Sequence, residues 1–371
     1  MNNARDKLTI CGSFGFRNAG DEAIPEAISD MLAELGQSSQ LNIVGRFDKT
    51  DMPEVITIAA QDAHRRQALK GDPVIMSGGG IIEEKEQASL FRCNELLQSK
   101  FTAKALLLGV SVEAGVRYSL STRYKIYKSL NNVHTVYTRD VLSEKTFKKV
   151  LPYFKTKMIG DLVLWHKPDA SQMPKNIQLP SDYIAVCLAP RWQDEPAWLH
   201  WIANELLVIS RELKTAIVFV PMSGKFDDDQ AENDRVAGAI QGMAPDIEVI
   251  SMPFISSPRL INYIFSQSQL VISMRLHGCV MAFAQQVPFV AIAYHPKLYG
   301  FTRTVNWSNS ILPSSMPNAQ AADTYGYNFL DVRLAKRDLV NKAIAAIGYS
   351  DFSLLNILKA KSLAAMKAEL F

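Results

Sequence analysis

The sequence predicts an α/β protein built from two doubly wound domains, and three observations support that prediction. Short apolar runs, typical of buried parallel strands, alternate with segments whose apolar residues recur at helical spacing. The alternation starts afresh after a polar stretch at 166–181, which contains Pro168, Pro174 and Pro180 and is typical of an interdomain linker. Several strands end in glycines or charged residues, as strands do where ligands bind at the carboxyl ends of parallel sheets.

The first domain is expected to span residues 1–167. Its predicted strands are the apolar runs at 8–11, 41–46, 73–82, 104–110, 133–139 and 157–164. A helix is predicted to begin at Asp21, because Ile24 and Ile28 fall on one side of it, and another is predicted at 141–149.

The second domain is expected to span residues 180–330. Its predicted strands lie at 183–189, 216–222, 247–252, 270–274 and 289–294, and its predicted helices at 196–213, 230–242, 257–267 and 279–285. The polar segment Gly300–Gly326 is expected to be a loop. Two helices, at 332–347 and 353–370, are then predicted, and residues 331–371 are expected to pack back toward the first domain.

Two glycine-rich loops follow strands of the first domain. Gly12, Gly15 and Gly20 match neither GxGxxG nor a P-loop. This loop is either a tight connection whose Asp21 caps the next helix, or a backbone segment that approaches a ligand. The run Gly78 to Gly80 favours a ligand contact, because three consecutive glycines are costly to order.

Charged residues also stand at strand ends. Arg139 follows a strand of the first domain, whereas Arg275, His277 and Lys297 follow strands of the second. They could form an anion site, since ligands bind at this edge of parallel sheets. The alternative is structural: Arg139 pairs with Asp140, and Arg275 and His277 form a pair at a domain edge.

The composition bears on which partners, metals and cellular compartments are expected. A net charge of +3 is too small to indicate a nucleic-acid partner, but it leaves open a small anionic ligand or a peripheral contact with an anionic membrane. The four cysteines are far apart and lack metal-ligand spacing, so no metal is expected, and buried thiols fit a reducing compartment. The polar N-terminus shows no signal peptide, and no apolar run approaches the ~20 residues of a transmembrane helix. A cytoplasmic protein is expected.

Five motifs occur in order between residue 8 and about residue 301. They are Gly12…Gly15…Asn18-Ala-Gly20-Asp21; Ser77-Gly-Gly-Gly80; Arg139-Asp140; Phe219-Val-Pro-Met222 with Asp227 and Asp228; and Met274-Arg-Leu-His-Gly278 with Val287-Pro288, Tyr294, Lys297 and Gly300-Phe301. Each is weak alone. Together, in this order, they resemble the motifs of the polysaccharide pyruvyltransferase family.

The resemblance implies a fold like that of the GT-B glycosyltransferases, with two Rossmann-like domains facing a cleft. It implies a transferase that moves the enolpyruvyl carbons of phosphoenolpyruvate onto two hydroxyls of a sugar in a polysaccharide precursor, forming a pyruvate ketal and releasing phosphate. The setting would be the synthesis of a bacterial exopolysaccharide, capsule or cell-wall polymer. The acceptor would be a saccharide, lipid-linked or nucleotide-linked, and phosphoenolpyruvate would be the donor substrate, with no cofactor.

Roles for individual residues follow from this chemistry. Arginine binds carboxylate and phosphate oxygens bidentately, so Arg139, Arg275 and Lys297 are predicted to hold the donor. His277 is predicted to be the general acid, because an imidazole exchanges a proton near neutrality. The predicted acceptor side comprises Gly12, Gly15, Asn18, Asp21, Gly79 and Gly80.

Two departures from the family pattern concern the acceptor. The segment Gly109-Val-Ser-Val-Glu-Ala-Gly115 replaces a Gly-x-Gly-x-x-Pro pattern, and Gly300–Gly326 contains no recognisable motif. Two other functions remain open. The same fold could use a nucleotide-sugar donor as a glycosyltransferase, or the chain could be a non-catalytic scaffold in polysaccharide assembly. The acceptor sugar, the general base and the oligomeric state are left open by the sequence.

Overall fold

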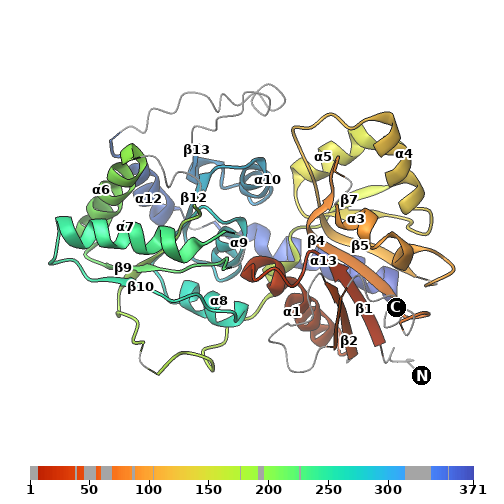
Figure 1. Ribbon diagram of the computed structural model, residues 1–371, viewed down its shortest axis with the longest axis horizontal. Helices are drawn as coiled ribbons and strands as arrows, with labels where there is room; N and C mark the ends of the chain where they lie inside the picture. Colours follow the sequence, from red (N-terminus) through yellow and green to blue (C-terminus); the bar gives the residue numbers. More distant parts are fainter. Residues whose placement is uncertain are drawn as a thin grey trace. The chain divides into compact units, whose positions relative to one another are not determined.

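The computed structural model describes residues 7–37, 40–45, 56–59, 69–85, 88–102, 104–175, 177–190, 196–224, 227–313, 336–349 and 351–371. The chain forms two compact units (Figure 1). Unit 1 comprises Met1–Phe16, Asp21–His166 and Leu355–Phe371, and unit 2 comprises Arg17–Gly20 and Lys167–Leu354. The chain therefore passes between the units more than once. Within the described ranges, every helix is too short or too polar to cross a membrane.

Unit 1 contains a sheet of seven strands that all run parallel. Their order is β3 (Ile56–Ala59), β2 (Gln40–Gly45), β1 (Lys7–Gly12), β4 (Val74–Ile82), β5 (Ala105–Val112), β6 (Val136–Thr138) and β7 (Thr156–Met158). The winding direction reverses between β1 and β4, where Gly12 stands beside Ser77. A β-carbon at Gly12 would lie 2.3 Å from the Ser77 carbonyl oxygen, so only glycine fits this position.

Most helices of unit 1 connect consecutive strands of its sheet, and one comes from the C-terminal end of the chain. They are α1 (Ala19–Glu34, whose first two residues belong to unit 2), α3 (Ser89–Arg92), α4 (Leu120–Ser129), α5 (Val141–Val150) and α13 (Ser353–Leu370), with 3-10 turns η1 (Asn94–Leu97) and η2 (Leu162–Trp165). Helix α13 is distant in sequence but well attached: Ser362 accepts a hydrogen bond from Trp165 Nε1, and Glu369 accepts one from the Tyr137 hydroxyl.

Unit 2 contains a second all-parallel sheet, of six strands. Their order is β10 (Val249–Ser251), β9 (Ala216–Phe219), β8 (Tyr183–Cys187), β11 (Leu270–Ser273), β12 (Phe289–Ala293) and β13 (Ile311–Pro313). Its helices are α6 (Pro196–Leu213), α7 (Asp229–Met243), α8 (Pro258–Ser266), α9 (Leu276–Ala284), α10 (Pro296–Thr304) and α12 (Asp338–Gly348), with the 3-10 turn η3 (Ser308–Ser310). Every residue of β8, β9, β11 and β12 is buried, as expected for parallel strands covered on both faces.

Both sheets follow the dinucleotide-binding order 3-2-1-4-5-6, which confirms the predicted pair of doubly wound, Rossmann-like folds. Several details differ from the sequence prediction. Strands β3 and β13 were not anticipated, because they are short and lie at or near sheet edges. The run 157–164 is not one strand: β7 ends at Met158, Gly160 turns the chain at a φ of +97°, and η2 follows.

The expected loop at Gly300–Gly326 is also partly wrong. Helix α10 continues to Thr304, and β13 adds to the sheet beyond it. The polar residues after Gly300 suggested a loop, but the hydroxyls of Thr302 and Thr304 form hydrogen bonds inside the helix. Each hydroxyl donates to the backbone carbonyl four residues earlier. Residues 314–326 lie outside the described ranges.

Candidate functional site

A tight turn follows β11 at the point where the winding of the second sheet reverses. Met274 leaves the strand, Arg275 precedes α9, and the Ser273 hydroxyl accepts the Arg275 N–H at 3.0 Å and donates to the Arg275 carbonyl at 2.8 Å. A β-carbon at Gly278 would lie 2.3 Å from the Ser273 Oγ, so this turn requires glycine. Met274 Sδ accepts the N–H of Ala189, which follows the neighbouring strand β8. The turn therefore fixes the backbone at the position where doubly wound sheets bind ligands.

Arg275 is buried and held by two carboxylates. Its Nε donates to Asp229 Oδ2 at 3.0 Å, its Nη1 donates to Asp227 Oδ2 at 2.9 Å, and its Nη2 donates to Asp229 Oδ1. Asp229 also accepts the N–H groups of Met222 and Ser223, at 3.1 and 3.0 Å. One carboxylate thus ties the end of β9, the start of α7 and the end of β11 together.

The two carboxylates beside Arg275 favour the charged form of its guanidinium. Burial acts to lower the pKa of Arg275, but the adjacent carboxylates, Asp229 above all, outweigh it and raise that pKa above its usual range. Three of the five N–H groups of the guanidinium are engaged by carboxylates.

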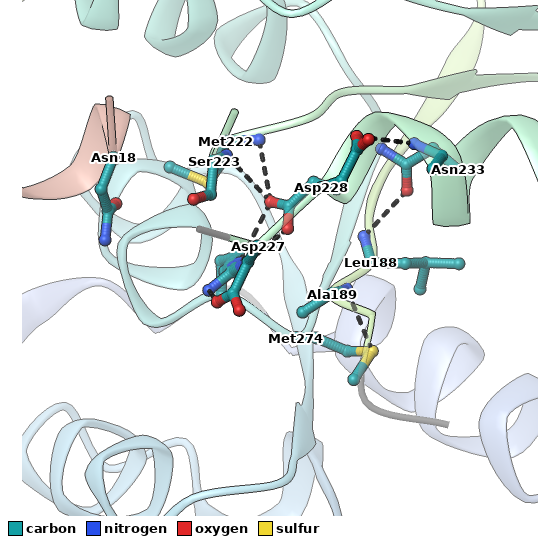
Figure 2. A network of polar contacts seen from close by, with 12 residues as sticks. Asn18, Leu188, Ala189, Met222, Ser223, Asp227, Asp228, Asn233 and Met274 are labelled. Atoms are coloured by element: carbon teal, nitrogen blue, oxygen red, sulfur yellow. Dashed lines mark hydrogen bonds and ion pairs between the residues drawn. The ribbon is translucent and has the colours of Figure 1, made fainter. Parts of the chain in front are cut away.

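The glycine loop of the N-terminal segment completes this site. Residues Arg17–Gly20 belong to unit 2, where Asn18 forms a β-bridge with Ser223 (Figure 2). The Ala19 N–H donates to the Met222 carbonyl at 2.9 Å, and the Gly224 N–H donates to the Arg17 carbonyl at 3.1 Å. A loop predicted on the acceptor side is thus bonded at its tip to the segment that holds Asp227 and Asp229.

Gly20 lies against His277. A β-carbon at Gly20 would be 2.0 Å from Nδ1 and 2.4 Å from Cγ of the imidazole, distances that real β-carbons essentially never show. His277 is 7% exposed, in the first turn of α9. The absence of a side chain at Gly20 is therefore what makes room for the histidine.

Lys297 lies in the segment that follows β12, the strand next to β11. It is the second residue of α10, not a strand end, and its Nζ stands over the Tyr294 ring, 5.5 Å from the centroid. His295 caps α10, since its Nδ1 accepts the Lys297 N–H at 3.2 Å. Arg275, His277 and Lys297 accordingly share one edge of the second sheet, where Tyr294 adjoins Lys297.

The remaining predicted residues gather at the corresponding edge of unit 1. Arg139 is buried; its Nε donates to Asp140 at 3.2 Å and its Nη1 lies 3.9 Å from Asp161. A β-carbon at Gly79 would lie 3.4 Å from Asp21 Oδ1 and 3.8 Å from Arg139 Nη1. Unit 1 therefore brings Asp21, Gly79 and Arg139 together. Asp21 is the third residue of α1, so it does not cap that helix.

Glu22 is the titratable residue of this edge that the sequence did not reveal. Its Oε1 accepts the N–H groups of Gly15 and Phe16, at 2.7 and 3.1 Å, and thereby shapes the glycine loop. Burial, with smaller effects from Asp21 and Glu26, raises the pKa of Glu22 to about 7, against the opposing effect of the two N–H groups. Gly80 completes the edge at a φ of +61°, where a β-carbon would lie 3.2 Å from Glu83.

The sequence patterns singled out neither Asp229 nor Glu22. The motif read from the sequence names Asp227 and Asp228, whereas the structure shows that Asp227 and Asp229 hold Arg275. Asp228 is exposed and caps α7 by accepting the Ala231 N–H. Across the described ranges, no cluster of three or more His, Cys, Asp or Glu side chains is arranged to hold a metal ion.

A known family covers most of the chain, including this site. A family model described as polysaccharide pyruvyl transferase matches residues 18–296, more than half of the chain. The matched region includes Asn18, Arg139, Asp227, Arg275 and His277. No curated protein matches the chain significantly.

Solved structures reproduce the fold at low identity. The UDP-GlcNAc 2-epimerase of Methanocaldococcus jannaschii, in complex with UDP-GlcNAc and UDP, is 10% identical with a TM-score of 0.55, over 98% of this chain and 99% of that one. A putative UDP-N-acetylglucosamine 2-epimerase of Listeria monocytogenes is 13% identical with a TM-score of 0.56, over 98% and 96%. The enzyme of Neisseria meningitidis bound to UDP-GlcNAc is 13% identical with a TM-score of 0.54, over 97% and 98%. At these identities the likeness shows the GT-B fold.

Proposed function

Because the chain belongs to the polysaccharide pyruvyl transferase family, we propose that it transfers the enolpyruvyl carbons of phosphoenolpyruvate to two hydroxyls of a saccharide. The observation that carries the proposal is the convergence on His277. Residues 17–20, 222–224, 227–229 and 274–278, which are far apart in sequence, meet at one edge of the second sheet, and Gly20 leaves space for that imidazole. A buried histidine beside a fixed arginine is suited to proton transfer.

The reaction needs one proton delivered to carbon. In the proposed sequence His277 protonates the methylene carbon of the donor, which becomes a methyl group, and the adjacent carbon becomes electrophilic. One sugar hydroxyl attacks that carbon and loses its proton, phosphate then leaves, and a second hydroxyl attacks and loses its proton. The products are the pyruvate ketal and phosphate; one of the two hydroxyl protons returns to His277 and the other is carried away by the phosphate.

The donor brings a carboxylate and a phosphate, and Lys297 is the first cation in this proposal. Its ammonium stands beside Tyr294 at the same sheet edge as His277, and its contact with the Tyr294 ring leaves its N–H donors available to an anion. Asp227 and Asp229 accept three of the five N–H groups of Arg275 and fix the position of its guanidinium. In this proposal the positive charge of that guanidinium attracts the anionic donor. Its direct contact with the donor stays a prediction, as does that of Arg139.

The acceptor is assigned to the edge of unit 1. Asp21 and Glu83 adjoin Gly79 and Gly80, where the missing side chains leave the backbone accessible. Carboxylates suit this role because they accept hydrogen bonds from sugar hydroxyls. Glu22 lies behind the same loop, and its raised pKa makes it the candidate general base, a role that the sequence left without a residue.

The test is a turnover assay on the full-length protein. Phosphoenolpyruvate is supplied with a panel of nucleotide-linked and lipid-linked sugars, and both phosphate release and the mass of the sugar product are followed. We expect acceptor-dependent phosphate release with the mass gain of one pyruvate ketal. His277→Asn should abolish it, whereas His295→Asn should not, because asparagine can still cap α10.

Two results would overturn the proposal. Tight binding of a nucleotide sugar, with no binding of phosphoenolpyruvate, would indicate a glycosyltransferase, the function of many proteins with this fold. Failure to bind phosphoenolpyruvate or any sugar donor would indicate a scaffold. Normal turnover in His277→Asn would remove this residue from the mechanism while leaving the reaction in place.

A further inference from the structure

Helix α4 of unit 1 exposes an apolar stripe. Leu120, Tyr124 and Tyr127 are 83%, 61% and 55% exposed, and they follow one another at intervals of four and three residues, on one face of the helix. The opposite face, formed by Thr122, Ile126 and Ser129, is buried in the unit. Single exposed apolar residues are ordinary on a protein surface, but three aligned on one helix face are a mark of an interaction surface.

Cations flank this stripe on both sides. Arg123 precedes Tyr124 and Lys128 follows Tyr127, and Lys125 and Arg117 add to the positive charge. The Lys128 ammonium lies 5.6 Å from the centre of the Tyr124 ring. No aspartate or glutamate occurs from residue 114 to residue 138, in a chain that has 37 of them. Glu84 accepts hydrogen bonds from Ser119 and Thr122 at the N-terminal end of the helix, on the side away from the stripe.

A hollow adjoins the same helix. It has a volume of about 480 Å³ and is lined by Phe91, Asn94, Tyr124, Lys125, Lys128 and Ser129. The Lys128 ammonium and the Asn94 amide provide donors for an anion, and two aromatic rings provide apolar walls. This combination suits a phosphate group attached to an apolar molecule better than a free ion, which would leave the rings unused.

We propose that α4 docks the protein on a membrane surface rich in anionic phospholipid. In this arrangement the helix lies in the plane of the interface, with Leu120, Tyr124 and Tyr127 among the head groups and the upper acyl chains. The lysines and arginines pair with lipid phosphates, and one head group enters the hollow. Tyrosine fits this depth, because its ring is apolar and its hydroxyl remains hydrated. The inference is independent of the proposed reaction.

Vesicle sedimentation with the full-length protein tests the proposal. Vesicles of phosphatidylcholine alone are compared with vesicles that also contain phosphatidylglycerol, at low and high salt. We expect binding to the anionic vesicles that weakens as salt increases, and little binding to the neutral ones. The variant Leu120→Ser/Tyr124→Ser/Tyr127→Ser should lower the partition coefficient by about tenfold or more, as should Lys125→Glu/Lys128→Glu.

A matched control comes from elsewhere on unit 1. Tyr153→Ser and Lys149→Glu alter a fully exposed tyrosine and an exposed lysine outside α4 and should leave the partition coefficient unchanged. Circular dichroism confirms that each variant is folded, which is expected because the substituted side chains are exposed. Equal loss of binding in the control and α4 variants would overturn the proposal, as would equal binding to both kinds of vesicle. The proposal would also be overturned if the parent protein did not bind vesicles and the stripe variant had half the parent's mass in solution. That result would show that a second copy of the chain covers the stripe.

Discussion

Gly20 and His277, separated by most of the length of the chain, touch so closely that no side chain fits between them. The distance from a β-carbon at Gly20 to the imidazole Nδ1 would be 2.0 Å. The backbone around Gly20 is fixed by the Ala19–Met222 hydrogen bond, so the glycine cannot move aside easily. A substitution there must therefore displace the histidine.

We predict that Gly20→Ala lowers turnover by on the order of 100-fold, because a displacement of about an ångström at a catalytic group has that effect. Gly20 is helical, so alanine itself is compatible with the backbone. Gly238→Ala is the matched control: Gly238 lies within α7 of the same unit, and its added methyl group would meet nothing within 4 Å. The control should keep full turnover and gain up to ~1 kcal/mol of stability. Equal turnover in the two variants would contradict the role given to this contact.

A second prediction concerns the pair Asp229 and Arg275. Asp229→Asn leaves a buried guanidinium without its main counter-charge and should reduce the free energy of unfolding by about 3–5 kcal/mol, measured by urea denaturation. Asp228→Asn should change it little, because Asp228 is exposed and asparagine caps a helix as well as aspartate does. A small effect at Asp229 would mean that Asp227 alone suffices to hold the arginine.

A third prediction concerns pH and Glu22. The folded pKa is about 7 and the ordinary value is 4.5, so the folded chain keeps a proton that the unfolded chain releases in this interval. Stability should fall as pH rises from about 4.5 to about 7, by about 3 kcal/mol at most, and level off above that. Glu22→Gln removes this titration, so the stability difference between variant and parent should move in favour of the variant over the same interval. A difference that is constant with pH would show that Glu22 titrates normally.

A fourth prediction separates the three glycines that end β4. Gly78 and Gly80 have φ values of +112° and +61°, so alanine at either should cost about 1–2 kcal/mol of stability. Gly79 has no such restriction, and its methyl group would stand between Asp21 and Arg139 at ordinary contact distances. Gly79→Ala should therefore fold normally but raise the KM for the acceptor, with that for phosphoenolpyruvate unchanged. A larger rise in the KM for phosphoenolpyruvate, which Arg139 is also predicted to contact, would contradict the assignment of the acceptor to this edge.

Local patterns in the sequence predicted most of the fold. Helices α6 and α13 begin and end where their apolar spacing indicates, and the buried strands of both sheets were recognisable as apolar runs. The helix hidden in the polar segment after Gly300 was not, because threonines that bond their own backbone look like loop residues in a sequence.

The sequence predicted several residues of the candidate site but not the contacts between them. The rule that ligands bind at the carboxyl ends of parallel strands located Arg275 and His277 correctly at such an edge. The rule carries no information on which residues from distant segments become neighbours. The carboxylates of Asp229 and Glu22 acquire their roles from burial and from backbone N–H groups, and the packing of Gly20 on His277 depends on tertiary structure alone.

The position of α13 has a consequence for biosynthesis. Unit 1 holds the first sheet to leave the ribosome, yet its Gly160 packs against Leu358 and its Trp165 and Tyr137 bond to residues of the same late helix. Domains generally fold in the order of their synthesis. Here the earlier unit must wait, with an uncovered surface, until all of the later unit has been translated. A chain truncated before residue 355 should therefore form the second unit but leave the first one incomplete.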